Sequence, residues 1–271
     1  MISIITPVLN AELQIEDCIK SVIDQQCNDV EHIIVDGKSE DNTKLIIKRY
    51  ADSYKHIRWI SENDTGQSNA MNKGIKLAKG EIIGILNSDD YHEPNTLNRV
   101  KNVFKNAQRP ALVVGNCKVW NDLGELLYVN KPAKLKITDL LMGWSINPHP
   151  VNPSAYFYHK TLHDIIGYYD ETMHFTMDLD FILRAVKVAK VKYCNETWGN
   201  YSYRENTKTA NDKRNGTADA RYKQCIHYHM KNITLLKRGT ISVTKKVHYV
   251  LKNVKYQIVS YQKIIGNAKN R

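Results

Sequence analysis

The stretch Glu81-Ile82-Ile83-Gly84-Ile85-Leu86-Asn87-Ser88-Asp89-Asp90 joins an apolar run of strand length to a polar, acidic end. This pattern is typical of a buried strand that delivers carboxylates to a ligand crevice. Adjacent acids repel one another, so a cation or a donor-rich ligand is expected in front of Asp89 and Asp90. The alternative is that both acids cap the next helix. Pro94 argues against this, because proline favours the first helical turn and moves the expected cap to residues 91–93.

Three similar apolar runs precede this stretch and alternate with helical patterns. Strands are predicted over residues 2–5, 31–36 and 57–60, and helices over residues 13–22, 43–47 and 66–78. Alternation at such short intervals indicates a parallel sheet with helices on both faces. Right-handed crossovers place the carboxyl ends of these strands at one edge, so Asp36 and Asp89 are expected to face the same crevice.

The alternation weakens after about residue 110. Strands are predicted over residues 111–120, 125–129, 154–158 and 191–203, helices over 161–166 and 179–188, and a proline-bearing loop over 143–153. Residues 1–220 are therefore expected to form one α/β domain with a nucleotide-binding first half and a more varied second half.

The composition is that of a soluble globular protein. The 271 residues are 42% hydrophobic and 25% charged, and no run approaches the roughly 18 apolar residues that cross a bilayer. The first residues already have strand character, so nothing predicts export. Five widely spaced cysteines without a CxxC pair indicate neither a disulfide framework nor a zinc site. A cytoplasmic location is therefore expected.

The net charge of +11 is concentrated in residues 221–271. That segment holds twelve Lys or Arg and no Asp or Glu, whereas residues 1–220 hold 27 basic and 28 acidic side chains. Such a segment can bind nucleic acid or an anionic membrane surface. No nucleic-acid motif accompanies the charge, so nucleic acid is not an expected partner.

Apolar residues in this tail recur at spacings of three and four and share one helical face, while its lysines lie mostly elsewhere. The face comprises Val243, Val247, Val250, Leu251, Val254, Ile258, Tyr261 and Ile265. The pattern predicts a basic amphipathic helical tail over residues 221–271. Two alternatives stay open: peripheral attachment to the inner face of the plasma membrane, or packing on the body with the basic face in solvent.

Four ordered motifs resemble those of the family 2 glycosyltransferases of GT-A fold. They are Ile5–Asn10 (ITPVLN), Ile34–Thr43 (IVDGKSEDNT), Asp64–Gly74 (DTGQ followed by AMNKG) and Leu86–Asp90 (LNSDD). The resemblance is strong over residues 1–100, fair over residues 147–208 and absent in the tail. It implies a nucleotide-diphospho-sugar transferase fold, with a Rossmann-like mixed sheet and helices on both faces. The activity it implies is inverting sugar transfer from a nucleotide diphosphate to an acceptor hydroxyl.

The resemblance assigns a nucleobase contact to Asp36. A pyrimidine offers an imide N–H, for which a carboxylate at a strand end is a strong acceptor, and uridine is the base implied. Thr6 and Pro7 would line the same base and ribose pocket. The alternative for Asp36 is a turn acid bonded to Ser39 or Lys38.

Further donor contacts are expected from both halves of the chain. Asp64 would contact the nucleoside or sugar, or cap a helix, and Lys73 would reach a phosphate or remain a solvated lysine. Asn87 and Ser88 are placed with the nucleotide sugar. Arg204 and Lys208 would clamp the diphosphate as a loop orders over bound donor, or be exposed charges of that loop.

The diphosphate needs charge neutralisation, which Mg²⁺ or Mn²⁺ supplies through one or two carboxylates and phosphate oxygens. The family pattern is an acid, any residue, then an acid, and here Asn87 takes the first place. The metal is therefore assigned to Asp89 with Asp90 in support, and its affinity without the donor is expected to be low.

An inverting displacement needs a base near the acceptor hydroxyl. The resemblance points to Asp178, where Met177 stands in the place of a frequent Glu. The alternative for Asp178 is a first-turn acid that favours the helix dipole. Asp180 and Arg184, four residues apart, are expected to form a structural ion pair. His149 is expected to be structural rather than catalytic.

Three hypotheses follow. The first is a membrane-associated transferase, for hexosyl or N-acetylhexosaminyl groups, that extends a saccharide or lipid-linked saccharide in bacterial O-antigen or capsule synthesis. The second is a donor-binding module without efficient turnover, motivated by Asn87 and Met177. The third, a nucleotidyltransferase, lacks the glycine-rich phosphate loop expected after the first strand.

Overall fold

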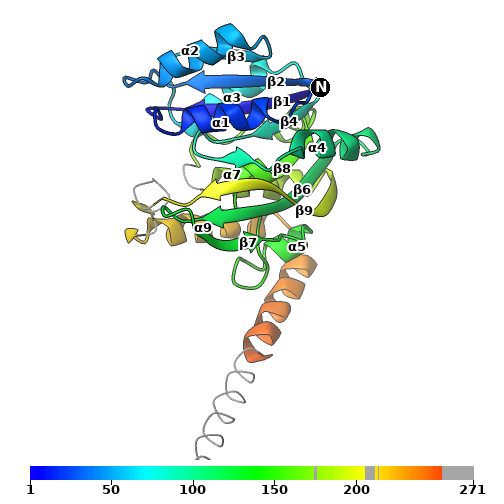
Figure 1. The fold of residues 1–271 in the computed structure, drawn as a ribbon. Helices are drawn as coiled ribbons and strands as arrows, with labels where there is room; N and C mark the ends of the chain where they lie inside the picture. Colours follow the sequence, from blue (N-terminus) through cyan, green and yellow to red (C-terminus); the bar gives the residue numbers. More distant parts are fainter. Residues whose placement is uncertain (174–175, 205–210, 213, 252–271) are drawn as a thin grey trace, which may run out of the picture.

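The computed structural model describes residues 1–173, 176–204, 211–212 and 214–251, and its centre is one mixed sheet (Figure 1). Nine strands of this described part form the sheet, in the order β3-β2-β1-β4-β8-β6-β9-β5, with β7 paired to β6. The strands are β1 Ile2–Val8, β2 Val30–Asp36, β3 Ile57–Ser61, β4 Ile82–Ile85, β5 Tyr91–His92, β6 Ala111–Trp120, β7 Leu126–Asn130, β8 Tyr156–His159 and β9 Lys190–Ser202.

The first four strands are parallel, as predicted. β1 pairs with β2 on one side, with Val8 opposite Asp36, and with β4 on the other, with Ile5 opposite Ile85. β8 then pairs antiparallel with β4 and β6, which makes the complete sheet mixed. Every residue of β1, β2 and β4 is buried, as expected for strands covered on both faces.

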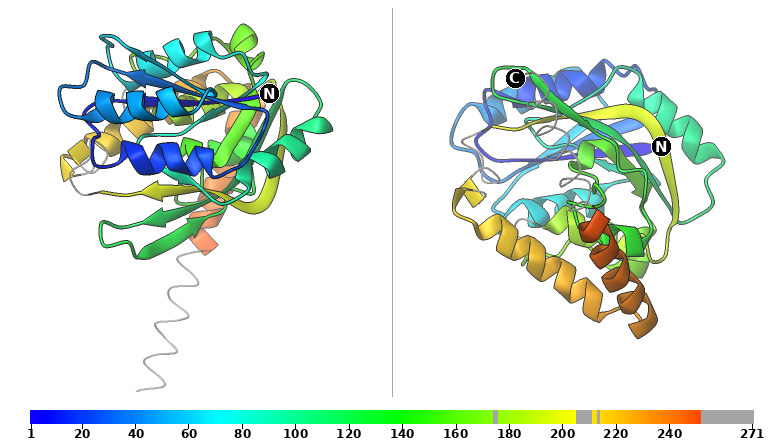
Figure 2. Two further views of the ribbon diagram at one scale, coloured as in Figure 1. Left: turned by 45° about the horizontal axis from the view of Figure 1, so that its top comes forward. Right: turned by 90° about the horizontal axis from the view of Figure 1, so that it is seen from below.

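Helices cover both faces of the sheet (Figure 2). On one face, α1 (Ile15–Ile23), α2 (Thr43–Ser53) and α4 (Thr96–Lys105) share two apolar clusters with the strands. On the other, α3 (Gln67–Leu77), α6 (Leu162–Ile166), α7 (Met177–Ala185) and α9 (Thr217–Lys231) share a third cluster. Two short elements, α5 (Ile137–Leu140) and the 3₁₀ turn η1 (Pro153–Ala155), connect strands of the second half.

The predicted helix start near Pro94 is wrong by a few residues. α4 begins at Thr96 behind Asn95, which adopts a left-handed φ of 59°. Tyr91 and His92 instead form the short strand β5, which pairs with β9. Backbone pairing with a strand about a hundred residues away therefore overrode the local helix signal at residues 91–93.

The predicted domain boundary after residue 220 falls inside α9. This helix runs from Thr217 to Lys231, and Cys225 and His229 on it are buried. His229 Nε2 lies 2.8 Å from Asp180 Oδ1 on α7. α9 is therefore part of the body, and the described part of the tail that follows contains a helix over residues 235–251 (orange in Figures 1 and 2).

The apolar face of this last helix points away from the body. Ile241 is 2% exposed and belongs to the core cluster below the sheet, whereas Val243 is 62% exposed and Val247 is 52% exposed. The expected residues Val254, Ile258, Tyr261 and Ile265 lie outside the described residues. Of the helices in the described ranges, none is both long and apolar enough to cross a membrane.

Candidate functional site

The acidic end of β4 forms a network around Asp90, which is 1% exposed. Asn87 and Asn152 each donate through Nδ2 to Asp90 Oδ2, over 2.9 and 2.7 Å, and the backbone N–H of Ser202 donates to Oδ1 over 3.2 Å. Burial, followed by the charge of Asp89, raises the pKa of Asp90 well above its usual value. Asp90 thus ties β4 to the proline-bearing loop and to the end of β9.

Asp89 differs from Asp90 because its side chain is partly exposed. Burial raises the pKa of Asp89, while the nearby guanidinium of Arg204 lowers it. The structure therefore brings together two residues that the sequence predicts on the diphosphate side, one from the segment after β4 and one from the segment after β9. Ser88, beside Asp89, is also partly exposed.

The donor set at this edge fits a divalent cation only in part. Within the described ranges, no group of three His, Cys, Asp or Glu side chains converges on a metal position. Both oxygens of Asp90 already accept hydrogen bonds, so its expected role as a second metal ligand has no support in this geometry. Asp89 remains, and Mg²⁺ held by one carboxylate together with substrate phosphates is a common arrangement.

Asp36 lies at the end of β2 and is fully buried. Its carboxylate accepts hydrogen bonds from the backbone N–H and hydroxyl of Ser39 and from the hydroxyl of Ser61. Without ligand, Asp36 is therefore the turn acid of the alternative interpretation. Asp64 lies beside it, since its Oδ2 is 2.5 Å from where a side chain on Gly37 would begin, and its Oδ1 accepts from Gly66 N over 2.8 Å.

Thr6 and Lys73, both expected to contact the nucleotide sugar, have side chains that bond to other residues of the protein. Thr6 is buried and its hydroxyl lies 2.8 Å from His32 Nε2, on the face covered by α1, so only its backbone is left for the expected pocket. Pro7 is buried in β1. Lys73 donates to Asn63 O over 2.6 Å and pairs with Glu62 at 3.0 Å, so it does not have the free ammonium expected of a phosphate ligand.

Asp178 lies in the first turn of α7 and is partly buried. Tyr156 donates its hydroxyl to Asp178 Oδ1 over 2.8 Å. Burial raises the pKa of Asp178 to about 6, although the bond from Tyr156 acts to lower it. A carboxylate with a pKa near 6 is suited to general-base chemistry at neutral pH.

The start of α3 connects Asp178 to the end of β4. Met177, next to Asp178, is buried and accepts a bond from the Ser68 hydroxyl at 3.0 Å. Gln67, next to Ser68, donates to Asn87 Oδ1 over 2.8 Å. The N-termini of α3 and α7 and the carboxyl end of β4 therefore meet at one place. Gln67 stands in a motif of the sequence, but nothing there indicates that it contacts Asn87.

Several further expectations concern structural residues. The ion pair of Asp180 and Arg184 is confirmed at 2.8 Å. His149 is buried, its Nε2 lies 2.7 Å from Leu140 O, and burial lowers its pKa to about 4, in keeping with a structural role. Lys208 lies outside the described residues.

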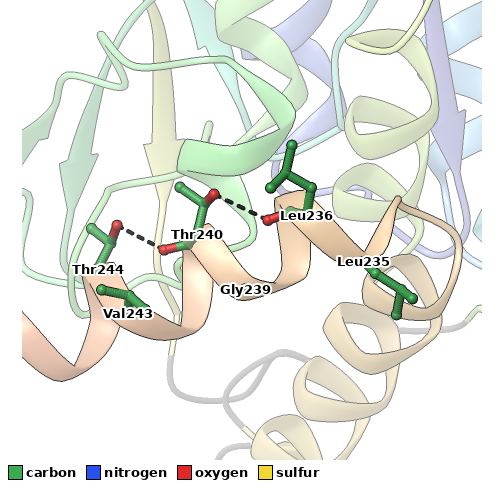
Figure 3. Close-up of a pocket in the computed structure, with 6 residues that line it drawn as sticks. All are labelled: Leu235, Leu236, Gly239, Thr240, Val243 and Thr244. Atoms are coloured by element: carbon green, nitrogen blue, oxygen red, sulfur yellow. Dashed lines mark hydrogen bonds between the residues drawn. The ribbon is translucent and has the colours of Figure 1, made fainter.

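An open groove of about 640 Å³ lies on the tail helix (Figure 3). Its lining is Leu235, Leu236, Gly239, Thr240, Val243 and Thr244. Thr240 and Thr244 donate their hydroxyls to the helix carbonyls of Leu236 and Thr240, so they present mainly methyl groups outward. The groove continues the exposed apolar face of this helix.

Comparison with known proteins gives consistent results. Residues 3–163 match the family Glycosyl transferase family 2. The uncharacterized glycosyltransferase EpsJ of Bacillus subtilis is 29% identical over 238 residues, which cover 85% of this chain and 67% of EpsJ. Chondroitin synthase of Escherichia coli is 31% identical over 105 residues, covering 39% of this chain and 15% of that enzyme. A Rickettsia felis glycosyltransferase is 26% identical, and the matched region covers only 32% of it.

Solved structures share the fold. The S. aureus TarS 1-349 structure superposes with a TM-score of 0.66 at 17% identity, covering 89% of this chain and 68% of that one. The same fragment in complex with UDP-GlcNAc gives a TM-score of 0.63 at 19% identity, covering 77% of this chain and 60% of the other. These similarities, with the mixed sheet covered on both faces, confirm the predicted GT-A type of fold.

Proposed function

Because this chain belongs to glycosyl transferase family 2, we propose that it is an inverting transferase that moves a sugar from a UDP-sugar to a hydroxyl of a saccharide acceptor. The observation that carries the proposal is that α3 bridges the start of α7 and the segment after β4, since Ser68 bonds to Met177, next to Asp178, and Gln67 bonds to Asn87. A base and a diphosphate-binding edge at one place are what an inverting displacement requires.

Asp178 acts as the base in this proposal. With a pKa of about 6 it is mainly ionised at pH 7 and accepts the proton of the acceptor hydroxyl. The hydroxyl oxygen bonds to the anomeric carbon as the bond to the diphosphate breaks, and UDP leaves with that electron pair. Within the described residues, Tyr156 donates to Oδ1 of Asp178 and no hydrogen-bond donor contacts Oδ2 of Asp178. In this proposal Oδ2 takes the proton of the acceptor hydroxyl.

The donor side uses the edge formed by β1, β2 and β4. Asp36 accepts a hydrogen bond from the uracil N–H in exchange for one of its bonds from Ser39 or Ser61. Asp64 and the backbone of Thr6 and Pro7 line the same pocket. Arg204 and Asp89 face the diphosphate, with Asn87 and Ser88 toward the sugar. Mn²⁺ or Mg²⁺ held by Asp89 and the phosphates would neutralise the leaving group. Lys73 would join them only after leaving Asn63 and Glu62.

The acceptor we propose is a saccharide linked to a lipid, in cell-surface polysaccharide synthesis of the O-antigen or capsule type. The support is the tail after α9, since residues 235–271 hold nine Lys or Arg and no Asp or Glu, and the described part of this tail turns an apolar face outward. Such a helix suits peripheral attachment to an anionic cytoplasmic leaflet. Self-association through the same face would bring only positive charges together, which disfavours it.

The test is the variant Asp178→Asn in the full chain. The transfer of a hexosyl or N-acetylhexosaminyl group, assayed over a panel of UDP-sugars with Mn²⁺, is expected to be lost. Binding of the same donor, measured by thermal shift, is expected to persist, because a ligand of the folded state raises its melting temperature. Loss of donor binding in the variant would refute the base assignment.

The second candidate is a donor-binding module without efficient turnover. It is favoured by Asn87 in place of the first family acid and by Met177, whose side chain is buried beside Ser68 rather than offered to substrate. Metal-dependent release of UDP by the wild-type protein would exclude it.

A further inference from the structure

We propose that Tyr156 is a positioning residue for Asp178, and that its hydroxyl fixes the orientation and protonation of the base. The inference rests on the proposed function of Asp178 and extends it to a residue outside the family motifs. Its physical basis is a buried contact between β8, which adjoins the strand of the diphosphate site, and α7, which carries the base.

Tyr156 is well placed to set this geometry. It is fully buried on β8, where Phe157 pairs with Gly84, so Tyr156 lies beside the carboxyl end of β4. Its hydroxyl donates to Asp178 Oδ1 over 2.8 Å, and its ring stacks on Phe181 of the same helix, with 6.3 Å between centroids. Two contacts thus hold the first turns of α7 against the strand next to the site.

The second side of α7 is held at Met177, which accepts the Ser68 hydroxyl of α3. A carboxylate bonded at one oxygen from a fixed, buried donor has little freedom to rotate. Small misplacements of a reacting group cost large factors in rate, so this restraint bears directly on transfer.

The Tyr156 hydroxyl has a defined direction. A phenol has one hydrogen, and at Tyr156 it is committed to the Asp178 carboxylate. Tyr169 OH lies 3.3 Å from Tyr156 OH, so Tyr169 must be the donor in that pair. Tyr169 is also buried, and the two phenols form a short polar chain that ends on the base.

Removing the hydroxyl therefore has a predictable sign. A donor to a carboxylate stabilises the charged form, so its loss favours the protonated acid and raises the pKa of Asp178. The proton-accepting form of the base would then appear only at higher pH. A role in packing alone would lower stability without moving this titration.

The experiment compares Tyr156→Phe with Tyr158→Phe in the full chain. Tyr158 is an equally buried phenol on the same strand, and its hydroxyl contacts His163 and Tyr169 but does not bond to Asp178 directly. The carboxyl ¹³C signal of Asp178, assigned by its absence in Asp178→Asn, is titrated in each protein. Tyr156→Phe is expected to raise the midpoint by about one pH unit, while Tyr158→Phe leaves it near the wild-type value.

The rate of UDP-sugar turnover falls at low pH as Asp178 becomes protonated. In Tyr156→Phe this fall is expected to shift to higher pH by the same amount as the midpoint of the Asp178 carboxyl titration. An unchanged Asp178 midpoint in Tyr156→Phe, or an equal change in Tyr158→Phe, would overturn the role of Tyr156. Failure of the proposed function is seen separately, as retained transfer in Asp178→Asn, because the carboxyl titration does not depend on activity.

Discussion

Asn152 donates through Nδ2 to Asp90 Oδ2 over 2.7 Å, and this buried bond joins the proline-bearing loop to the acidic end of β4. The bond separates the roles of two adjacent acids. Asp90 organises the surrounding loops, whereas Asp89, partly exposed and near Arg204, is left for a ligand.

Asp90→Asn is therefore expected to lower stability. An amide keeps one acceptor oxygen and turns an N–H toward the donors Asn87, Asn152 or Ser202 N, so at least one buried donor loses its partner. We expect a loss of about 2 kcal/mol in the free energy of unfolding, measured by urea denaturation. Asp89→Asn is the matched control: it should keep stability within about 0.5 kcal/mol and lose Mn²⁺-dependent donor binding. If Asp89→Asn lost stability and Asp90→Asn lost donor binding instead, Asp89 would be the structural residue and Asp90 the ligand-binding one.

Asp178 is expected to make the protein less stable as the pH rises. Its folded pKa of about 6 lies above the ordinary 3.8, so between these values the folded state binds more protons than the unfolded state. The stability contribution is therefore full at low pH and falls as pH rises through this window. Asp178→Asn should be about 3 kcal/mol more stable than wild type at pH 7 and similar to it near pH 3.5. Chemical denaturation at both pH values measures this, and a constant difference would contradict it.

Met177 is expected to act as a core residue. It is buried and contacts Ser68, so Met177→Leu should cost less than about 1.5 kcal/mol in unfolding free energy. Met177→Glu would place a carboxylate in this site and should cost about 3 kcal/mol or more at pH 7. Equal stability of the two variants would show that position 177 can open toward the substrate side and accommodate the family acid.

The tail helix is expected to bind anionic vesicles through its outward face. Val247→Asp places a negative charge on that face and should reduce flotation with vesicles rich in anionic lipid by several-fold. Ser242→Asp is the matched control. Residue 242 is exposed, and this substitution adds the same charge outside the apolar face predicted from the sequence. Removal of residues 235–271 should abolish flotation. Equal binding by all forms would remove the membrane role, and a concentration-dependent dimer lost in Val247→Asp would indicate a second copy as the partner.

The sequence by itself determined much of the fold. Apolar runs ending in polar residues identified β1, β2 and β4, because a strand buried on both faces needs continuous apolar side chains. Alternation with helices then placed Asp36 and Asp89 at one sheet edge. The same sequence indicated a tail helix with one apolar face.

Only the tertiary structure decided what each polar group contacts. Asp90 became the centre of a network because Asn152 and Ser202 approach it from segments 62 and 112 residues away. In the same way the hydroxyl of Tyr156 meets Asp178, and Ile241 rather than Val243 or Val247 is the residue packed on the body. A local pattern fixes which residues share a face or an edge. Hydrogen-bond partners and the direction of a face depend on the packing of distant segments, which local periodicity does not encode.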